Sequence, residues 1–359
     1  MKPTIKTPLK VLLVVFQMLA YVIQSSAQDI HFSQFTMTPI LLDPSQAGKF
    51  GGDQRAIVNY RDQWSSVMNN SFRTYGVSFD MHLNKKAKKD NFFGIGLTAF
   101  SDKAGGISLG TTILNVSLAY HVRMNQSSYF SAGAKAGIIQ NSLTPSQLRF
   151  DNQFDGSGHN ESLSSGEDFN QRSLLNPDFA IGLSYTWGTN TSDKVISNNG
   201  FDGKKMNIGF AAHHVSSPDY SYLEPQTDNL NLKYILHANT SFGIHETNTA
   251  IQPSGFIQYQ EGATNIVLGT FFRYNLKEKS KYSQFSNGAA MSVGIHYRIS
   301  DAIIPSILIE MGSIAIGVSY DINVSGLSTA TGGQGGYEFS IRYVNPNPFG
   351  GRKSQSRFF

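Results

Sequence analysis

Histidines and serines are the residues of this chain whose types could carry chemistry. His213, His214, His237, His245 and His296 all fall in the second half of the sequence. A metal site would need several such side chains to meet in space, and a hydrolase would need a Ser, a His and an orienting partner. Serines are spread along the whole chain, and no nucleophile elbow, a G-x-S-x-G turn from a strand into a helix, is predicted. Because cysteine is also absent, we predict no enzyme activity, no metal site and no cofactor.

Two further kinds of motif carry weaker signals. NKKAKKD (84–90) is a basic turn that we interpret as solvated, with contact to an anionic partner as the alternative. The Gly-rich stretches GSG (156–158) and TGGQGG (331–336) precede no predicted helix, so they do not predict phosphate binding. The net charge of +4 is small for 359 residues and the other Lys and Arg are scattered. Nucleic-acid binding is therefore not expected.

Alternating hydrophobicity predicts the elements that must position these residues. In IAIGVSYDI (314–322) every second residue is large and apolar, and the residues between are small or polar. A period of two is typical of a strand with one apolar face. The same pattern recurs along the chain and no helical period extends beyond two turns. It predicts fourteen strands, at about 54–63, 72–83, 95–100, 111–122, 129–140, 178–187, 205–215, 232–244, 250–260, 265–275, 290–299, 302–310, 314–322 and 336–344.

These strands indicate a membrane barrel rather than two soluble β-sandwiches. Most are about ten residues long, the length that a tilted strand needs to cross a bilayer, whereas sandwich strands average five or six. The faces opposite the apolar sets carry Gly, Ser, Ala, Asn and a few cations, unlike the charged face of a soluble sheet, and charged residues make up only 15% of the chain. Aromatic residues such as Tyr120, Trp187 and Tyr343 stand at strand ends, as in the aromatic girdles of outer-membrane barrels. The predicted fold is an all-β, transmembrane antiparallel β-barrel of about fourteen strands.

The N-terminus predicts export. Lys2, Lys6 and Lys10 precede the apolar run Val11–Ile23, and Ser25 and Ala27 occupy small-residue positions of a cleavage site. The run is too short for a spanning helix. We therefore predict a signal peptide at 1–27, a periplasmic or plug segment at 28–53, the transmembrane barrel at 54–344 and a periplasmic tail at 345–359.

The even strand count predicts the orientation and the use of the lumen. Both termini are expected in the periplasm, with the loops at 141–177 and 322–336 outside. The long turn at 188–204 is an exception to the short periplasmic turns and is either a contact surface or a misplaced strand pair. A barrel of this size is too wide for side chains alone to fill. The segment 28–53 could occupy the lumen, but small lumen-facing residues would equally leave room for water.

Charged residues of the first and last strands predict an interior network. Arg61 of YRDQW (60–64) faces the lumen, and strands one and fourteen must meet to close the barrel. Arg61, Asp321, Glu338 and Arg342 are therefore expected in one network, in which structural pairing is the simpler role because buried charges need partners. The alternative is that the network holds a cargo domain. The candidate binding residues are Arg61, Trp64, Asp321, Glu338 and Arg342.

Both ends of the chain resemble a known family. QDIHFSQFTMTPILLDPSQAG (28–48), NYRDQW (59–64), FRTYGVSFD (72–80), IPSILIEMGSIAIGVSYDINVSGL (304–327) and GGYEFSIRY (335–343) are similar to the PorP/SprF family of type IX secretion proteins of Bacteroidota. The segment DPSQAG departs from the Asn-Pro-Ala type more usual there.

The resemblance implies an outer-membrane accessory of type IX secretion and, in gliding species, of adhesin display. The implied partners are a secreted cargo or adhesin with a C-terminal secretion domain, the periplasmic ring lipoproteins and outer-membrane lipid. A porin or small-solute transporter of the same fold is the alternative, and an outer-membrane lipid hydrolase is a third possibility.

Overall fold

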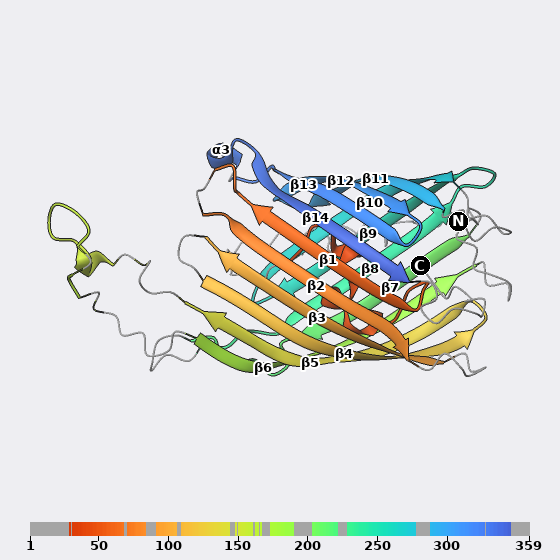
Figure 1. Ribbon diagram of the computed structural model, residues 1–359, viewed down its shortest axis with the longest axis horizontal. Coiled ribbons are helices and arrows are strands. Elements are labelled where there is room, and N and C mark those ends of the chain that lie inside the picture. Colours follow the sequence, from red (N-terminus) through yellow and green to blue (C-terminus); the bar gives the residue numbers. More distant parts are fainter. Residues whose placement is uncertain are drawn as a thin grey trace, which may run out of the picture.

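Fourteen antiparallel strands close into a single barrel. The computed structural model describes residues 29, 31–67, 70–83, 91–105, 109–143, 148, 150–160, 162–164, 166, 173–189, 203–221, 228–277, 288–326 and 328–345. Each strand pairs with its neighbours in sequence, and β1 also pairs with β14 to complete the circle (Figure 1). The strands are β1 (Gln54–Gln63), β2 (Phe72–Leu83), β3 (Phe92–Ala104), β4 (Leu109–Asn125), β5 (Ser128–Ser142), β6 (Ser173–Gly188), β7 (Lys204–His213), β8 (Lys233–Gly243), β9 (Thr249–Gln260), β10 (Ala263–Lys277), β11 (Ala289–Arg298), β12 (Ala302–Met311), β13 (Ile314–Asn323) and β14 (Gln334–Asn345). The predicted all-β antiparallel barrel of fourteen strands is confirmed.

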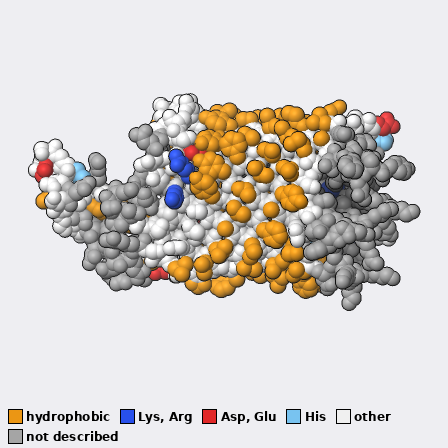
Figure 2. Space-filling view, in the orientation of Figure 1, with side chains coloured by type: hydrophobic (Ala, Val, Ile, Leu, Met, Phe, Trp, Pro, Cys, Tyr) orange, Lys and Arg blue, Asp and Glu red, His pale blue; other side chains and the backbone are white. Residues whose placement is uncertain are grey.

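Alternation decides which side chains face out. On β13, Ile314, Ile316 and Val318 are 38–45% exposed, whereas Ala315 and Ser319 are 2% exposed. Apolar residues of the other strands are exposed in the same way, and on the face seen in Figure 2 they form a belt across the middle of the barrel. A continuous apolar belt of this size is covered by something other than water. In a closed barrel the belt faces the hydrocarbon core of a membrane.

Several strands are longer than the ten residues that the sequence predicts. β4, β5 and β6 have 17, 15 and 16 residues. Their additional residues lie at the strand ends, where pairing continues but the apolar alternation stops. The periodicity therefore marks the part of each strand that lies in the apolar belt, not its full length.

Two ends of the barrel are distinguished below. At the proximal end β1 begins and β14 ends, and at the distal end β1 turns into β2 and the long β5–β6 connection projects (Figure 1). That connection contains the 3-10 helix η4 (Asp151–Gln153), and the short helix α3 (Ser328–Thr331) lies between β13 and β14. No helix within the described ranges is long and apolar enough to cross a membrane.

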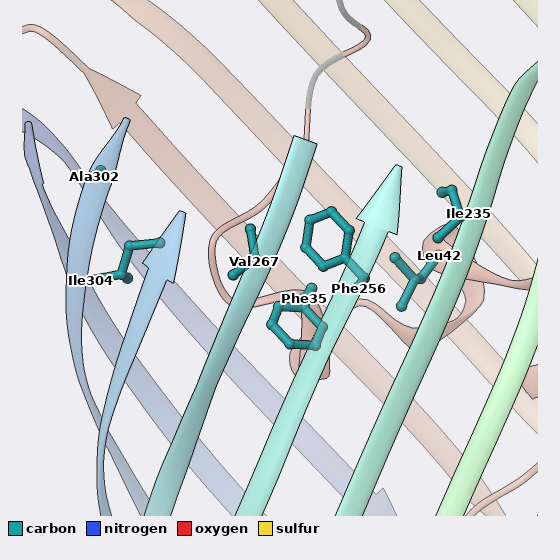
Figure 3. Packing of buried hydrophobic residues seen from close by; sticks show 7 residues of the cluster. All are labelled: Phe35, Leu42, Ile235, Phe256, Val267, Ala302 and Ile304. Atoms are coloured by element: carbon teal, nitrogen blue, oxygen red, sulfur yellow. The ribbon is translucent and has the colours of Figure 1, made fainter. Parts of the chain in front are cut away.

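A non-strand segment lies inside the barrel. Residues 31–53, here called the lumenal segment, contain the short helices η1 (Phe35–Met37), α2 (Pro39–Leu42) and η2 (Pro44–Gln46). Phe35 and Leu42 pack against inward-facing side chains of β8, β9, β10 and β12 (Figure 3). The other members of this cluster are Ile235, Phe256, Val267, Ala302 and Ile304. This apolar cluster therefore lies between the segment and one side of the barrel wall, and a smaller cluster of Ile40, Ala47 and Ala119 joins the segment to β4.

Some predictions concern residues outside the described part of the chain. These are the signal peptide at 1–27, the basic turn at 84–90, most of the turn at 188–204 and the tail from residue 346 onward. The assignment of the proximal end to the periplasm also stays a prediction.

Candidate functional site

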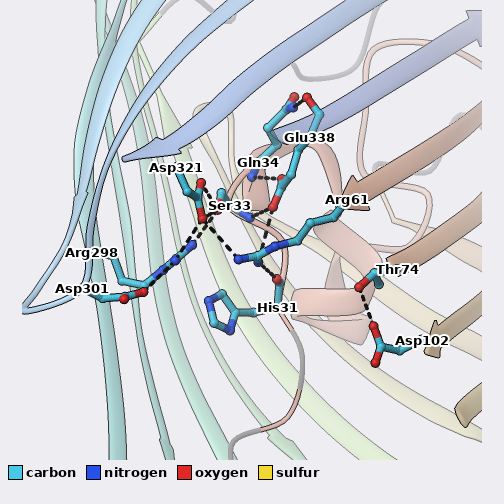
Figure 4. A network of polar contacts seen from close by, with 10 residues as sticks. All are labelled: His31, Ser33, Gln34, Arg61, Thr74, Asp102, Arg298, Asp301, Asp321 and Glu338. Carbon is cyan, nitrogen blue, oxygen red and sulfur yellow. Dashed lines mark hydrogen bonds and ion pairs between the residues drawn. The ribbon is translucent and has the colours of Figure 1, made fainter. Parts of the chain in front are cut away.

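Three of the predicted site residues meet at the distal half of the lumen. Arg61 Nη2 lies 3.2 Å from Asp321 Oδ2, and Arg61 Nη1 lies 3.4 Å from Glu338 Oε1 (Figure 4). The side chains of all three are 2–4% exposed. Strand pairing explains the meeting, because Arg61 stands opposite Glu338 across the β1–β14 closure. A buried guanidinium with two carboxylates is an arrangement that needs further donors to be stable.

The lumenal segment supplies those donors. The backbone N–H groups of Ser33 and Gln34 donate to the two oxygens of the Glu338 carboxylate, at 2.6 and 2.8 Å. The Ser33 hydroxyl donates to Asp321 at 2.8 Å, and Arg61 donates to the carbonyl of His31. The wall charges are therefore paired with one another and, through the same atoms, hold the segment. Hydrogen bonds to ionised groups are among the strong ones in proteins.

Arg298 is a member of this network that the sequence reasoning missed. Its Nη1 atom lies 3.1 Å from Asp321 Oδ2 and 2.9 Å from Asp301 Oδ2. It is the last residue of β11 and lies on the polar, lumenal face of that strand, whereas its neighbour Tyr297 lies on the outer face. The alternation along β11 could have predicted this role. It places Arg298 in the lumen at the same end of the barrel as Asp321, and a buried Arg needs an acid nearby.

Arg342 is not part of the network, which corrects the prediction for this residue. Four residues along β14 separate it from Glu338, about 13 Å in an extended strand. Arg342 pairs instead with Glu310 of β12, and Arg273 of β10 binds the same carboxylate, both at 2.8 Å. The alternation along β14 places Arg342 on the lumenal face, as predicted. Its position along the barrel axis, which the alternation does not give, decides which acid it can reach.

Trp64 also lies outside the network. It follows β1 with a positive φ of 63°, and its backbone N–H donates to Gly335 O at 2.9 Å. Its ring packs edge-on against Phe72 at 5.2 Å between centroids, and its Nε1 atom is buried without a hydrogen-bond partner. The structure therefore places Trp64 at the distal end of the barrel, where its contacts through the backbone N–H and the ring are with Gly335 and Phe72 rather than with the charged network.

A second anchor holds the middle of the lumenal segment. Asp43 is fully buried, and its Oδ2 atom lies 2.8 Å from His237 Nε2 on β8. The Asp43 carboxylate also accepts from the backbone N–H of Ser45, which caps η2. Two other lumenal histidines bond carbonyls of the segment: His121 Nε2 lies 2.9 Å from Ala47 O, and His213 Nε2 lies 3.1 Å from Leu42 O.

A third anchor lies at the proximal side. Arg55 and Asp80 form a two-bonded ion pair at 2.9 and 2.8 Å, and the N–H of Gly48 donates to the same carboxylate at 2.7 Å.

At the distal end of the lumen, Asp29 binds Lys233 at 2.7 Å and His214 at 2.6 Å. Burial would raise the pKa of the Asp29 carboxyl, but these cationic partners hold it well below its usual range. The chain from Asp29 to Asp53 therefore runs the length of the lumen.

Glycines of the wall leave the space that the segment fills. A Cβ on Gly133 of β5 would lie 2.5 Å from the backbone N of Ser45, and one on Gly94 of β3 would lie 2.0 Å from Ala47 O. A Cβ on Gly182 of β6 would lie 2.0 Å from a carboxylate oxygen of Asp43. No side chain fits at such distances, so the backbone of the segment and the backbone of the wall are in direct contact.

A distal and a proximal cavity lie in the described part of the lumen. A distal cavity of about 260 Å³ is lined by residues that include Phe100, Lys135 and Tyr220. A proximal cavity of about 340 Å³ is lined by residues that include Lys205, Glu310 and Arg342. Both are bounded by Phe35 and Leu42, so the lumenal segment stands between them.

The catalytic candidates do not assemble. Among the described residues, no group of three or more His, Asp or Glu side chains is placed to hold a metal ion. Among the wall histidines, His121, His213 and His237 bond the segment and His296 bonds Ser254 of β9, whereas His245 is an exposed turn residue. The stretch Gly106–Gly110 does have the G-x-S-x-G spacing, but it leads into the strand β4 rather than into a helix. It therefore lacks the strand-to-helix context of a nucleophile elbow.

Comparison with known proteins gives one family. The family model described as "Type IX secretion system membrane protein PorP/SprF" matches residues 24–343. A search of the curated proteins found no match. Among solved structures, the Pseudomonas putida toluene transporter TodX is similar with a TM-score of 0.43 and 8% identity, over 89% of this chain and 94% of that one. The translocator domain of the autotransporter NalP from Neisseria meningitidis has a TM-score of 0.39 and 10% identity, over 87% and 95% of the two chains.

Proposed function

The chain belongs to the PorP/SprF family of type IX secretion system membrane proteins, and from that premise we propose that it is an accessory barrel of the outer membrane that acts by binding partners. At its distal loops it binds a secreted cargo or adhesin that carries a C-terminal secretion domain, for export and surface attachment. At its proximal turns it contacts the periplasmic ring lipoproteins of the machine. A cleavable leader brings it to the membrane, with the proximal end in the periplasm.

The seated lumenal segment is the observation that carries this proposal. An accessory needs a rigid barrel that presents loops, whereas a diffusion pore needs an open lumen. Here three anchors made of buried charged or polar groups hold one segment along the lumen, and wall glycines contact its backbone directly. A segment held in this way favours binding over conduction. The gliding and adhesin-display roles of the family are part of the same proposal.

An affinity capture from the native outer membrane tests the proposal. The tagged protein is extracted in mild detergent and its partners are identified by mass spectrometry. We expect one large exported protein together with periplasmic lipoproteins. A barrel that is recovered alone, repeatedly and in good yield, would contradict the accessory function and would favour the porin alternative.

The distal loop offers a matched variant. Its tip contains η4 and a bridge between Phe154 and His159, and Phe154 is 62% exposed. Deletion of 150–160 removes this tip without altering a strand of the barrel. The variant should lose the exported protein and keep the lipoproteins. Loss of both classes, or of neither, would count against separate distal and proximal contacts.

A further inference from the structure

The proximal cavity carries an excess of positive charge. Arg273 and Arg342 line it, and Glu310 is the acid among its described lining residues. Arg273 and Arg342 share that single carboxylate, and the three side chains are 23–26% exposed, so their head groups are in contact with the space of the cavity. Lys49 and Arg55 also line it, but Lys49 binds Ser184 and Arg55 is neutralised by Asp80. Within the described lining, two accessible guanidinium groups therefore share one acid.

The remaining lining is polar and the cavity extends to the rim. The uncharged polar lining includes Asn207, Ser241 and Gln252, and the rim is formed by turn residues that include Gly312 and Ser313. The volume of about 340 Å³ is at the lower end of the range for ligand pockets. It accommodates a short extended segment but not a folded domain. The deep wall is the lumenal segment itself, through Phe35, Met37 and Phe50.

From this geometry we propose that the proximal cavity is a binding site for a carboxylate-rich peptide segment of a partner protein. Guanidinium groups bind carboxylates in two-bonded geometry, and two of them around one internal acid leave donors for a second acid. The neutral Asn, Ser and Gln side chains match the amide groups of a peptide backbone. This inference rests on the proposed function and adds to it the chemistry by which a partner on the proximal side is recognised.

The chain's own tail does not fit this cavity. Residues 346–359 follow β14 in the sequence, but they carry Arg352, Lys353 and Arg357 and no acidic side chain. Like charges oppose binding to a cationic cavity. Charge complementarity therefore favours an acidic segment from another protein.

A peptide titration of the purified barrel in detergent tests the site. The probe is a short fluorescent peptide in which Glu alternates with Ser, and the matched control peptide has Gln in place of Glu. The Glu peptide should bind, more weakly at higher salt because charge screening acts on exposed pairs. Equal binding of the Gln peptide, or no binding of the Glu peptide, would overturn the proposal. Inorganic phosphate that displaces the peptide at equal total charge would overturn the assignment to a peptide and leave a simple anion site.

Two variants with opposite expected effects separate binding from folding. Arg342→Gln removes one donor and should weaken binding about tenfold. Glu310→Gln removes the internal competitor and should strengthen binding about threefold, by the same charge argument. Arg73→Gln on β2, an exposed side chain at the distal end, is the control and should change nothing. Weaker binding by both cavity variants would indicate a structural role and would contradict the proposal.

The outcome is independent of the capture experiment. If capture recovers no secretion partner while the peptide binds with this pattern of variants, the proposed function fails and the cavity assignment stands. If capture recovers the lipoproteins equally well from wild type and Arg342→Gln membranes and the peptide does not bind, the cavity assignment fails and the proposed function stands.

Discussion

Gly133→Ala is the substitution that tests most sharply how the lumenal segment is seated. The added Cβ would lie 2.5 Å from Ser45 N and 2.6 Å from the carbonyl carbon and oxygen of Pro44. All three atoms belong to the backbone, so no side chain can rotate to relieve the contact. Overpacking of this kind costs about 1–3 kcal/mol. Because β5 also pairs along its whole length with β4 and β6, the segment is the element that must move.

Labelling of an introduced cysteine reads this movement. The chain has no cysteine, so Ala47→Cys gives a single thiol at a residue that is 0% exposed. If labelling follows local opening, 1–3 kcal/mol corresponds to a rate increase of about 5- to 150-fold. The matched control is Gly326→Ala, whose Cβ would meet open space and should leave the rate unchanged.

An unchanged labelling rate in Gly133→Ala, with an unchanged melting temperature, would refute the direct contact between the segment and β5. Equal acceleration by Gly133→Ala and Gly326→Ala would also refute it, because the effect would then not depend on the position of the Cβ.

Three further predictions follow from the charges and from the apolar belt. Arg61→Gln leaves Glu338 without a buried cationic partner and leaves Asp321 with Arg298 alone. It should lower the free energy of unfolding by about 3–5 kcal/mol, measured by denaturant titration, whereas Arg73→Gln should change it by less than about 1 kcal/mol. Val116 lies in the middle of β4 and is 48% exposed. Val116→Arg should lower the free energy of unfolding in a bilayer by about 2–4 kcal/mol, whereas Met124→Arg at the end of the same strand should lower it by about 0–1 kcal/mol. Equal losses would contradict the membrane position of the belt. Burial lowers the pKa of Lys49 from 10.5 to about 7, although Asp43 opposes this change. The withdrawn segment therefore takes up a proton between these pH values that the seated segment does not. Labelling of Ala47→Cys should slow as the pH rises from 7 to 10, after correction for thiol ionisation with an unfolded control, and Lys49→Gln should abolish this trend.

Strand positions were predictable because the barrel uses only two environments. A residue of β13 faces either lipid or lumen, so hydrophobicity alternates strictly, and the apolar stretch Ile314–Ile322 is found as predicted. The meeting of Arg61 with Glu338 also followed, because an even-stranded barrel must join its first and last strands.

The site was less predictable, because the alternation of a strand shows which side chains face the lumen but not where along the barrel axis each one lies. Arg342 and Glu338 share a face, yet they bind different partners along β14. Arg298 was missed for the related reason that pairs formed across β11 and β13 have no fixed spacing in sequence. The path of the lumenal segment has no periodicity at all. Its contacts with Gly133 and Gly182 depend on the close approach of two backbones, which small residues permit but do not specify.

Single-channel conductance in a planar bilayer tests the central claim, that this barrel acts by binding and not by conduction. The full barrel should show no stable open channel, and a variant that lacks residues 28–52 should conduct, because the lumenal segment stands between the two cavities. A full-length barrel that conducts as well as the deletion variant would contradict the account and would make this protein a pore.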